Sequence, residues 1–235
     1  MNSLTAKLTN SPFAARVAPF LVYLALTFCQ GSFGEAARYW LYLAKTLVGA
    51  WMLWIVWPFV VEMRWKISWE AVAVGVAVFM LWVGLDSVVP TQLALWVKLG
   101  LSESPEAAPP AWNPFQQFGA GTALGWGFVA ARIIGSSIVV PPLEEVFYRS
   151  FLYRWIIKPD FMTVRLGEFI PKSFLLTAVV FGLAHNEWLA GIFCAAAYQG
   201  LVCWKQRLGD AMTAHAITNF LLGLWIVGRG AWNFW

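Results

Sequence analysis

The sequence is poor in charged side chains. Only 12% of its 235 residues are charged and 60% are hydrophobic, whereas a soluble domain has about 25% charged residues. This shortage excludes an ordinary soluble domain and predicts an integral membrane protein in contact with a lipid bilayer. The net charge of +4 requires no nucleic acid as a partner, because Lys and Arg in the cytoplasmic loops of a membrane protein account for it.

Residues that commonly bind metal ions are also scarce. The three cysteines, Cys29, Cys194 and Cys203, are scattered through apolar segments and show no CxxC spacing. We therefore interpret them as packing residues. His185 and His215 are the chain's two histidines.

Long apolar runs are abundant instead. A hydrocarbon core of about 30 Å requires roughly 20 apolar residues per helix. Because lipid-exposed backbone must satisfy its own hydrogen bonds, the runs predict an all-α, polytopic integral membrane helical bundle with seven to eight transmembrane helices. A β-barrel would need many short alternating segments, and the continuous run 71–85 argues against it. The candidate spans are about 17–30, 39–61, 69–88, 120–140, 142–157, 173–186, 188–204 and 208–228.

The chain length fits one compact bundle. We predict a cytoplasmic N-terminal segment at 1–16 and a single transmembrane domain at 17–235, with a motif-bearing core at 120–228. The Pro-, Ser- and Glu-containing stretch 89–114 predicts an external loop. The positive-inside rule assigns four basic groups, and with them the N-terminus, to the cytoplasmic side. These groups are Lys7 and Arg16; Arg64 and Lys66; Lys158, Arg165 and Lys172; and Lys205 and Arg207.

The segment "PPLEEVFYR" (141–149) places polar residues between apolar runs. Pro141 and Pro142 predict the start of a helix, with Glu144 and Glu145 in its first turn, where the helix dipole favours negative charge. Glu145 and Arg149 have the i, i+4 spacing of an ion pair. Glu144 would point about 100° away and stay available. The alternative is that both glutamates form one ion-pair cluster with Arg149.

Two further polar groups contain the histidines. His185 ends "FGLAH" (181–185), and His215 begins "HAITN" (215–219), in which His215 and Asn219 share one helix face. Ionisable groups in membrane spans are functional candidates by default, so we expect the three polar groups to converge on one site. Depth counting places His185 near the outer side and His215 nearer the inner side, so convergence requires a broken, tilted or miscounted helix.

Other charged residues in the apolar segments are isolated. Lys45, Asp86 and Arg132 have no motif around them. For these we favour snorkelling or local pairing over a functional role.

Together, the polar motifs resemble those of a known family. "EEVFYR" (144–149) fits EExxxR, "FGLAH" fits FxxxH and "HAITN" fits HxxxN. In this order they resemble the CAAX prenyl protease 2 and bacteriocin-processing (Abi) superfamily of glutamate-dependent intramembrane proteases, over about 141–225. The stretch "RYWLYLAKTLVGAWMLW" (38–54) is similar to CAAX-protease-related proteins that accompany bacterial exosortase sorting systems.

The resemblance implies an intramembrane endopeptidase that needs no metal or other cofactor. Glu144 with His185 would activate water, and His215 with Asn219 would hold the oxyanion. Glu145 and Arg149 would support the site. The partner would be a membrane-associated protein or peptide substrate, and the location a bacterial inner (cytoplasmic) membrane.

Other functions stay open at this point. A zinc-dependent membrane protease could use the two histidines and a glutamate as ligands, although the chain has no HExxH. A non-proteolytic scaffold or immunity-type membrane protein could keep the same fold. A transporter would favour two similar half-sequences with broken helices in each. A serine protease is disfavoured because the sequence has no GxSxG motif.

Overall fold

The computed structural model describes residues 8, 10–101 and 111–235, and this part of the chain contains helices and turns but no strand. The prediction of an all-α polytopic bundle is confirmed. In chain order, the elements are α2 (Pro12–Cys29), α3 (Glu35–Val56), α4 (Trp69–Asp86), α5 (Gln92–Lys98), α6 (Pro114–Phe118), α7 (Ala123–Ile134), η2 (Gly135–Val139), α8 (Val140–Glu145), η3 (Val146–Leu152), α9 (Tyr153–Ile157), η4 (Phe161–Thr163), α10 (Pro171–Leu183), α11 (Trp188–Lys205), α12 (Gly209–Arg229) and η5 (Trp232–Phe234).

Five helices of the described residues are long and apolar enough to cross a membrane: α2, α3, α4, α12 and the continuous helix Ala123–Ile157. With α10 and α11 they form the bundle. Helix α2 begins at Pro12 rather than near residue 17. The predicted spans 120–140 and 142–157 are one helix of 35 residues, so the estimate of eight spans counted this helix twice.

The prolines do not start a helix, which corrects the prediction from the sequence. The helix passes through Pro141 and Pro142 by way of two π-helical segments, η2 before them and η3 after them. Proline lacks an N–H and crowds the carbonyl four residues earlier, and wider π turns are often found at functional sites. Glu144 and Glu145 therefore lie inside a long helix, where no helix dipole end stabilises their charge.

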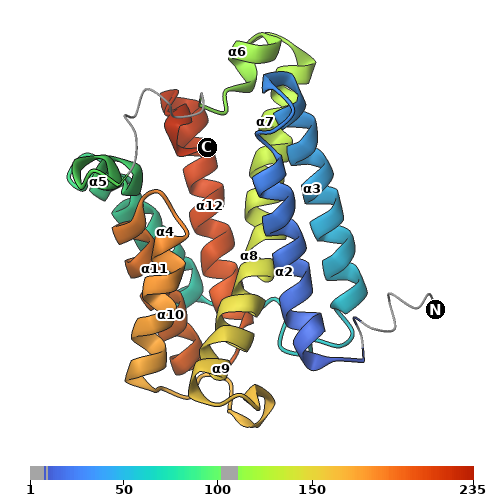
Figure 1. Ribbon diagram of the computed structural model, residues 1–235, viewed down its shortest axis with the longest axis vertical. Helices are drawn as coiled ribbons and strands as arrows, with labels where there is room; N and C mark the ends of the chain where they lie inside the picture. Colours follow the sequence, from blue (N-terminus) through green and yellow to red (C-terminus); the bar gives the residue numbers. More distant parts are fainter. Residues whose placement is uncertain (1–7, 9, 102–110) are drawn as a thin grey trace.

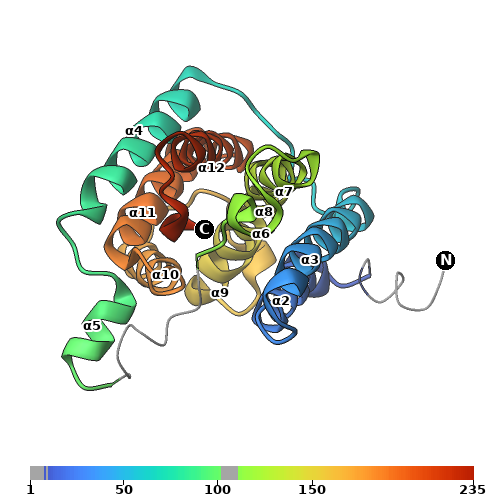
Figure 2. The same cartoon turned by 90° about the horizontal axis from the view of Figure 1, so that it is seen from above.

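The long helix Ala123–Ile157 separates two groups of helices (Figures 1 and 2). The pair α2 and α3 packs on one side of it, and α4, α10, α11 and α12 lie on the other side. Helix α4 approaches α12 closely because Gly75 has no side chain: a Cβ there would lie 2.7 Å from the carbonyl oxygen of Ala214. Small residues commonly allow such close packing of membrane helices.

Helix α10 is short, which removes the conflict over depth. Its 13 residues span about 20 Å at 1.5 Å per residue. The turn between α10 and α11 consequently lies well below the upper ends of α7 and α12 in Figure 1. His185, two residues beyond the end of α10, can thus face residues in the interior of the bundle.

A buried ionic cluster links α2 to η3, in the C-terminal part of the long helix. The guanidinium of Arg16 donates to both carboxylate oxygens of Glu62, at 2.8 and 2.9 Å, and Ser150 also hydrogen-bonds to Glu62. Burial alone would raise the pKa of Glu62, but the hydrogen bonds and charge of Arg16, with the bond from Ser150, leave it below its ordinary value. Glu62 therefore stays ionised and holds the two helices together.

Candidate active site

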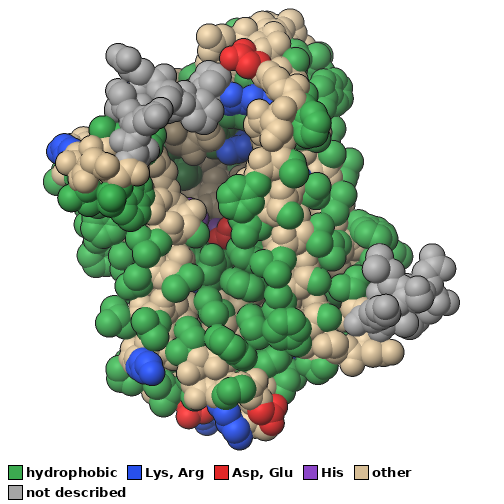
Figure 3. Space-filling view, in the orientation of Figure 1, with side chains coloured by type: hydrophobic (Ala, Val, Ile, Leu, Met, Phe, Trp, Pro, Cys, Tyr) green, Lys and Arg blue, Asp and Glu red, His purple; other side chains and the backbone are tan. Residues whose placement is uncertain are grey.

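A cavity of about 220 Å³ lies between the long helix, α4, α10, α11 and α12. Figure 3 shows a hollow on this face, with Lys or Arg side chains on its upper wall and His and acidic side chains lower down. The cavity is large enough for several water molecules, because one water occupies about 30 Å³ of liquid volume. It is lined by Trp82, Arg132, Ser136, Val140, Glu144, Phe181, His185, Glu187, Cys194, His215, Thr218, Asn219, Leu222, Phe234 and Trp235.

Glu145 lies behind the cavity wall and is fully buried. One carboxylate oxygen, Oε1, lies 3.0 Å from Nδ1 of His215. The other, Oε2, lies 3.1 Å from Nε of Arg149, as the i, i+4 spacing predicts. A single carboxylate thus joins the long helix to α12. It also compensates the buried charge of Arg149, which would be costly to bury without a partner.

Aromatic rings surround Arg149. Its guanidinium carbon lies 4.6 Å from the ring centre of Phe181, 5.6 Å from that of Tyr148 and 5.8 Å from that of Tyr198. Ring faces attract cations, and the attraction grows when water is excluded. The pair between Arg149 and Glu145 is consequently fixed in place and forms a rigid base beneath the cavity.

His215 is held from two sides. Its ring stacks on Tyr198, with 5.2 Å between ring centres, and Nδ1 must carry the hydrogen shared with Glu145 because an ionised carboxylate only accepts. This fixes the other nitrogen, Nε2, toward the cavity, 4.0 Å from Oε2 of Glu144.

Glu144 is the accessible glutamate of the pair. Its side chain is 17% exposed, whereas that of Glu145 is 0% exposed. Within the described residues the buried Oε2 of Glu144 has no hydrogen-bond partner, and the nearby Nε2 of His215 is 4.0 Å away. An acceptor in this state is free to bind whatever enters the cavity.

His185 reaches the cavity from the end of α10. Its Nδ1 lies 2.8 Å from the carbonyl oxygen of Phe181. A carbonyl only accepts, so Nδ1 carries the hydrogen and Nε2 of the neutral ring keeps a lone pair. The ring stacks on Phe181, with 4.6 Å between centres, and meets the edge of Trp82 at 5.6 Å. These contacts orient a proton acceptor.

Asn219 lies one turn beyond His215 on α12. Its amide nitrogen donates to the backbone carbonyl of Ser136 at 2.8 Å. This bond uses one of the two amide hydrogens and fixes the orientation of the group. The second hydrogen is available for a substrate oxygen.

The structure thus brings Glu144, His185, His215 and Asn219 to one cavity. The bond between Glu145 and His215 joins residues 70 positions apart and has no sequence signal. Arg132 also lines the cavity, and its guanidinium pairs locally with the rings of Tyr42 and Trp112. It begins a stripe with a four-residue spacing that the sequence does contain, namely Arg132, Ser136, Val140 and Glu144.

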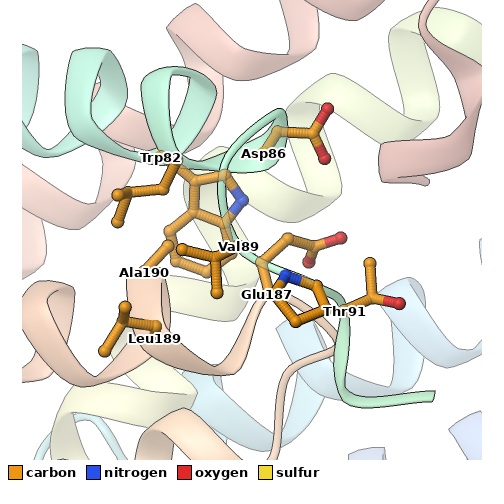
Figure 4. A pocket seen from close by; sticks show the side chains of 9 residues that line it. Trp82, Asp86, Val89, Thr91, Glu187, Leu189 and Ala190 are labelled. Atoms are coloured by element: carbon orange, nitrogen blue, oxygen red, sulfur yellow. The ribbon is translucent and has the colours of Figure 1, made fainter. Parts of the chain in front are cut away.

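A smaller pocket adjoins the cavity at the upper end of α4 (Figure 4). Trp82 and Glu187 line both spaces, and Asp86 lines the smaller one. Asn186 contacts α5 instead: its backbone carbonyl accepts a hydrogen bond from the backbone amide of Gln92 at 2.7 Å. Of the two polar residues after His185, one therefore belongs to the cavity and the other fastens α5.

The acidic and imidazole side chains are not arranged as a metal site. Across residues 8, 10–101 and 111–235, no group of three or more His, Cys, Asp and Glu side chains could hold a metal ion.

A comparison with known protein families matches a segment that contains Glu144, His185, His215 and Asn219. Residues 125–221 match the Rce1-like family, described as type II CAAX prenyl endopeptidase Rce1-like. This match, over less than half of the chain, supports the resemblance to the CAAX prenyl protease 2 and bacteriocin-processing superfamily in this segment. No curated protein and no solved structure matches the chain. The similarity to exosortase-associated proteins stays a prediction.

Proposed function

We propose that the protein is a glutamate-dependent intramembrane endopeptidase that hydrolyses a peptide bond of membrane-associated substrates. The observation that carries the proposal is the free carboxylate of Glu144, which shares one cavity with the oriented imidazole of His185. A general base must reach the water that it activates and must have a free lone pair. Both residues meet these conditions.

The first half of the reaction forms the tetrahedral intermediate. A water molecule bound between Glu144 and Nε2 of His185 gives a proton to the carboxylate as its oxygen attacks the scissile carbonyl carbon. The carbonyl oxygen becomes an oxyanion. The amide of Asn219 donates to it, and Nε2 of His215 also donates when the ring carries a hydrogen on each nitrogen. Each such donor contributes about 2.7–4 kcal/mol.

The second half releases the products. The protonated Glu144 returns its proton to the leaving nitrogen as the C–N bond breaks, so that one product carries a carboxyl group and the other an amine. Glu145 and Arg149 do not contact the substrate in this scheme. They keep His215 in the orientation that its role requires.

The location completes the proposal. We place the protein in a bacterial inner membrane with its N-terminus in the cytoplasm. The support is that the loops carrying the basic residues follow α3, α9 and α11 at one end of the bundle, the end at which α2 begins (Figure 1). The positive-inside rule assigns such an end to the cytoplasm.

Metal analysis separates this mechanism from zinc catalysis. A catalytic zinc needs about three protein ligands, and using Glu144 or Glu145 as one would remove the base or break the pair with Arg149. We expect the active, detergent-purified protein to contain no stoichiometric zinc by elemental analysis, and phenanthroline not to act by removing a metal. About one zinc per chain, with activity lost on its removal and restored on its return, would establish the metalloprotease instead.

Kinetics test the oxyanion role of Asn219. Asn219→Ala should lower kcat by about 10²–10³-fold, because the lost donor acts on charge that develops in the transition state. KM should change little. The matched control is Asn186→Ala, which removes the same group from the turn that contacts the backbone of Leu93. Equal kcat values for the two variants would remove Asn219 from the mechanism.

A further inference from the structure

Arg132 lines the cavity, yet the proposed chemistry does not use it. Its guanidinium carbon lies 4.5 Å from the ring centre of Tyr42, 4.9 Å from that of Trp112 and 5.8 Å from that of Trp235. Stacking on rings orients the planar group without using its N–H donors. Arg132 therefore presents a preoriented set of donors.

No carboxylate of the described residues lies within ion-pair distance of Arg132. Arg132 is partly buried, whereas the two most deeply buried arginines, Arg16 and Arg149, pair with Glu62 and Glu145. The backbone carbonyl of Arg132 accepts a hydrogen bond from the hydroxyl of Tyr42 at 3.2 Å, which leaves the guanidinium donors unused by this contact. A charge among apolar helices that no described carboxylate compensates is a functional candidate by default.

The position of Arg132 relates it to the reacting groups. It lies one turn, about 6 Å along the helix axis, before Ser136, whose carbonyl orients Asn219. Glu144 lies three turns away, about 18 Å. An extended peptide covers about 3.3–3.6 Å per residue, so a group bound at Arg132 is about five residues from the scissile bond.

We propose that Arg132 binds a carboxylate of the substrate and thereby sets the register of cleavage. Arginine and carboxylate pair through two parallel hydrogen bonds, which fixes both distance and orientation. The carboxylate can belong to the C-terminus of the substrate or to an Asp or Glu side chain. This inference rests on the proposed peptidase function for the identity of the ligand as a substrate.

Cleavage of a peptide library tests the proposal. Wild-type protein in lipid nanodiscs is incubated with a proteome-derived peptide library, and the cleavage sites are read by mass spectrometry. We expect cleavage about five residues from a carboxylate, favoured about 10- to 100-fold over peptides in which that group is neutralised. Arg132→Gln should remove the preference, and Arg132→Lys should retain part of it.

Two library arms distinguish the sources of the carboxylate. Amidation of every C-terminus abolishes the preference if the terminal carboxylate is bound, and replacement of Asp and Glu by Asn and Gln abolishes it if a side chain is bound. The control is Arg229→Gln, which removes an exposed cation from the end of α12. A preference that is absent in wild type, or unchanged in Arg132→Gln, would overturn the proposal.

A binding measurement separates failure of this inference from failure of the proposed function. Glu144→Gln protein in nanodiscs is mixed with the same libraries, and retained peptides are counted. Carboxylate peptides should be retained about 10- to 100-fold better than neutralised ones, and the additional change Arg132→Gln should erase the difference. Absent cleavage with this retention pattern refutes the peptidase and keeps the carboxylate site, whereas cleavage without the pattern does the reverse.

Discussion

Glu144→Gln is expected to abolish detectable hydrolysis while the protein still folds. General-base catalysis contributes about 10²–10⁴-fold to a rate, and an amide cannot accept the proton of the attacking water. The buried Oε2 of Glu144 has no hydrogen-bond partner among the described residues, so an isosteric amide sacrifices no contact at this atom. The measurement is single-turnover cleavage of a library-derived reporter, with the folded state monitored by size exclusion and circular dichroism.

Glu35→Gln is the matched control for this loss. It makes the same chemical change at an exposed position in the first turn of α3. Its kcat should equal that of wild type. Full activity of Glu144→Gln would exclude Glu144 as the base, and joint loss of activity and fold in Glu144→Gln would refute the assignment of a free carboxylate.

Glu145→Gln is expected to cause the largest loss of stability. Removing one partner of a buried ion pair costs about 3–5 kcal/mol, because the other charge stays buried and uncompensated. The change also weakens the bond that orients His215. Unfolding in mixed detergent micelles, followed by denaturant titration, should therefore show a lower midpoint for Glu145→Gln than for Glu144→Gln.

Two comparisons identify the cause of that loss. Glu70→Gln breaks a more exposed ion pair, in which the side chain of Glu70 is 35% exposed and that of Lys205 is 19% exposed. This change should lower the free energy of unfolding by only about 0–1 kcal/mol. The double change of Glu145→Gln with Arg149→Met removes the stranded charge and should recover part of the stability. Equal losses for Glu145→Gln and Glu70→Gln would show that the buried pair has no special role.

The sequence was informative where the physics is local or compositional. Low charge and long apolar runs were enough to predict a helical membrane bundle. The i, i+4 rule related Glu145 to Arg149, and the rarity of histidine drew attention to His185 and His215, which both line the cavity. Each of these inferences uses only the spacing of nearby residues or the amino-acid composition, and both can be read from the sequence without tertiary structure.

Tertiary contacts account for the errors. The helix start predicted at Pro141 failed because π-helical turns absorb the prolines within a longer helix. The bond from Glu145 to His215 depends on how α12 packs, which no spacing reveals. Arg132 was set aside because its relation to Glu144 becomes visible only when 123–157 is treated as one helix.

The short α10 also affects the surrounding lipid. A wall about 20 Å tall borders a hydrocarbon layer of about 30 Å, so the bilayer beside α10 must thin, or the protein must tilt. Either response costs fractions of a kcal/mol for each ångström of mismatch. Thinning on that side brings interfacial water closer to the turn at His185. The membrane would then supply, by its own deformation, a route for the water that hydrolysis consumes.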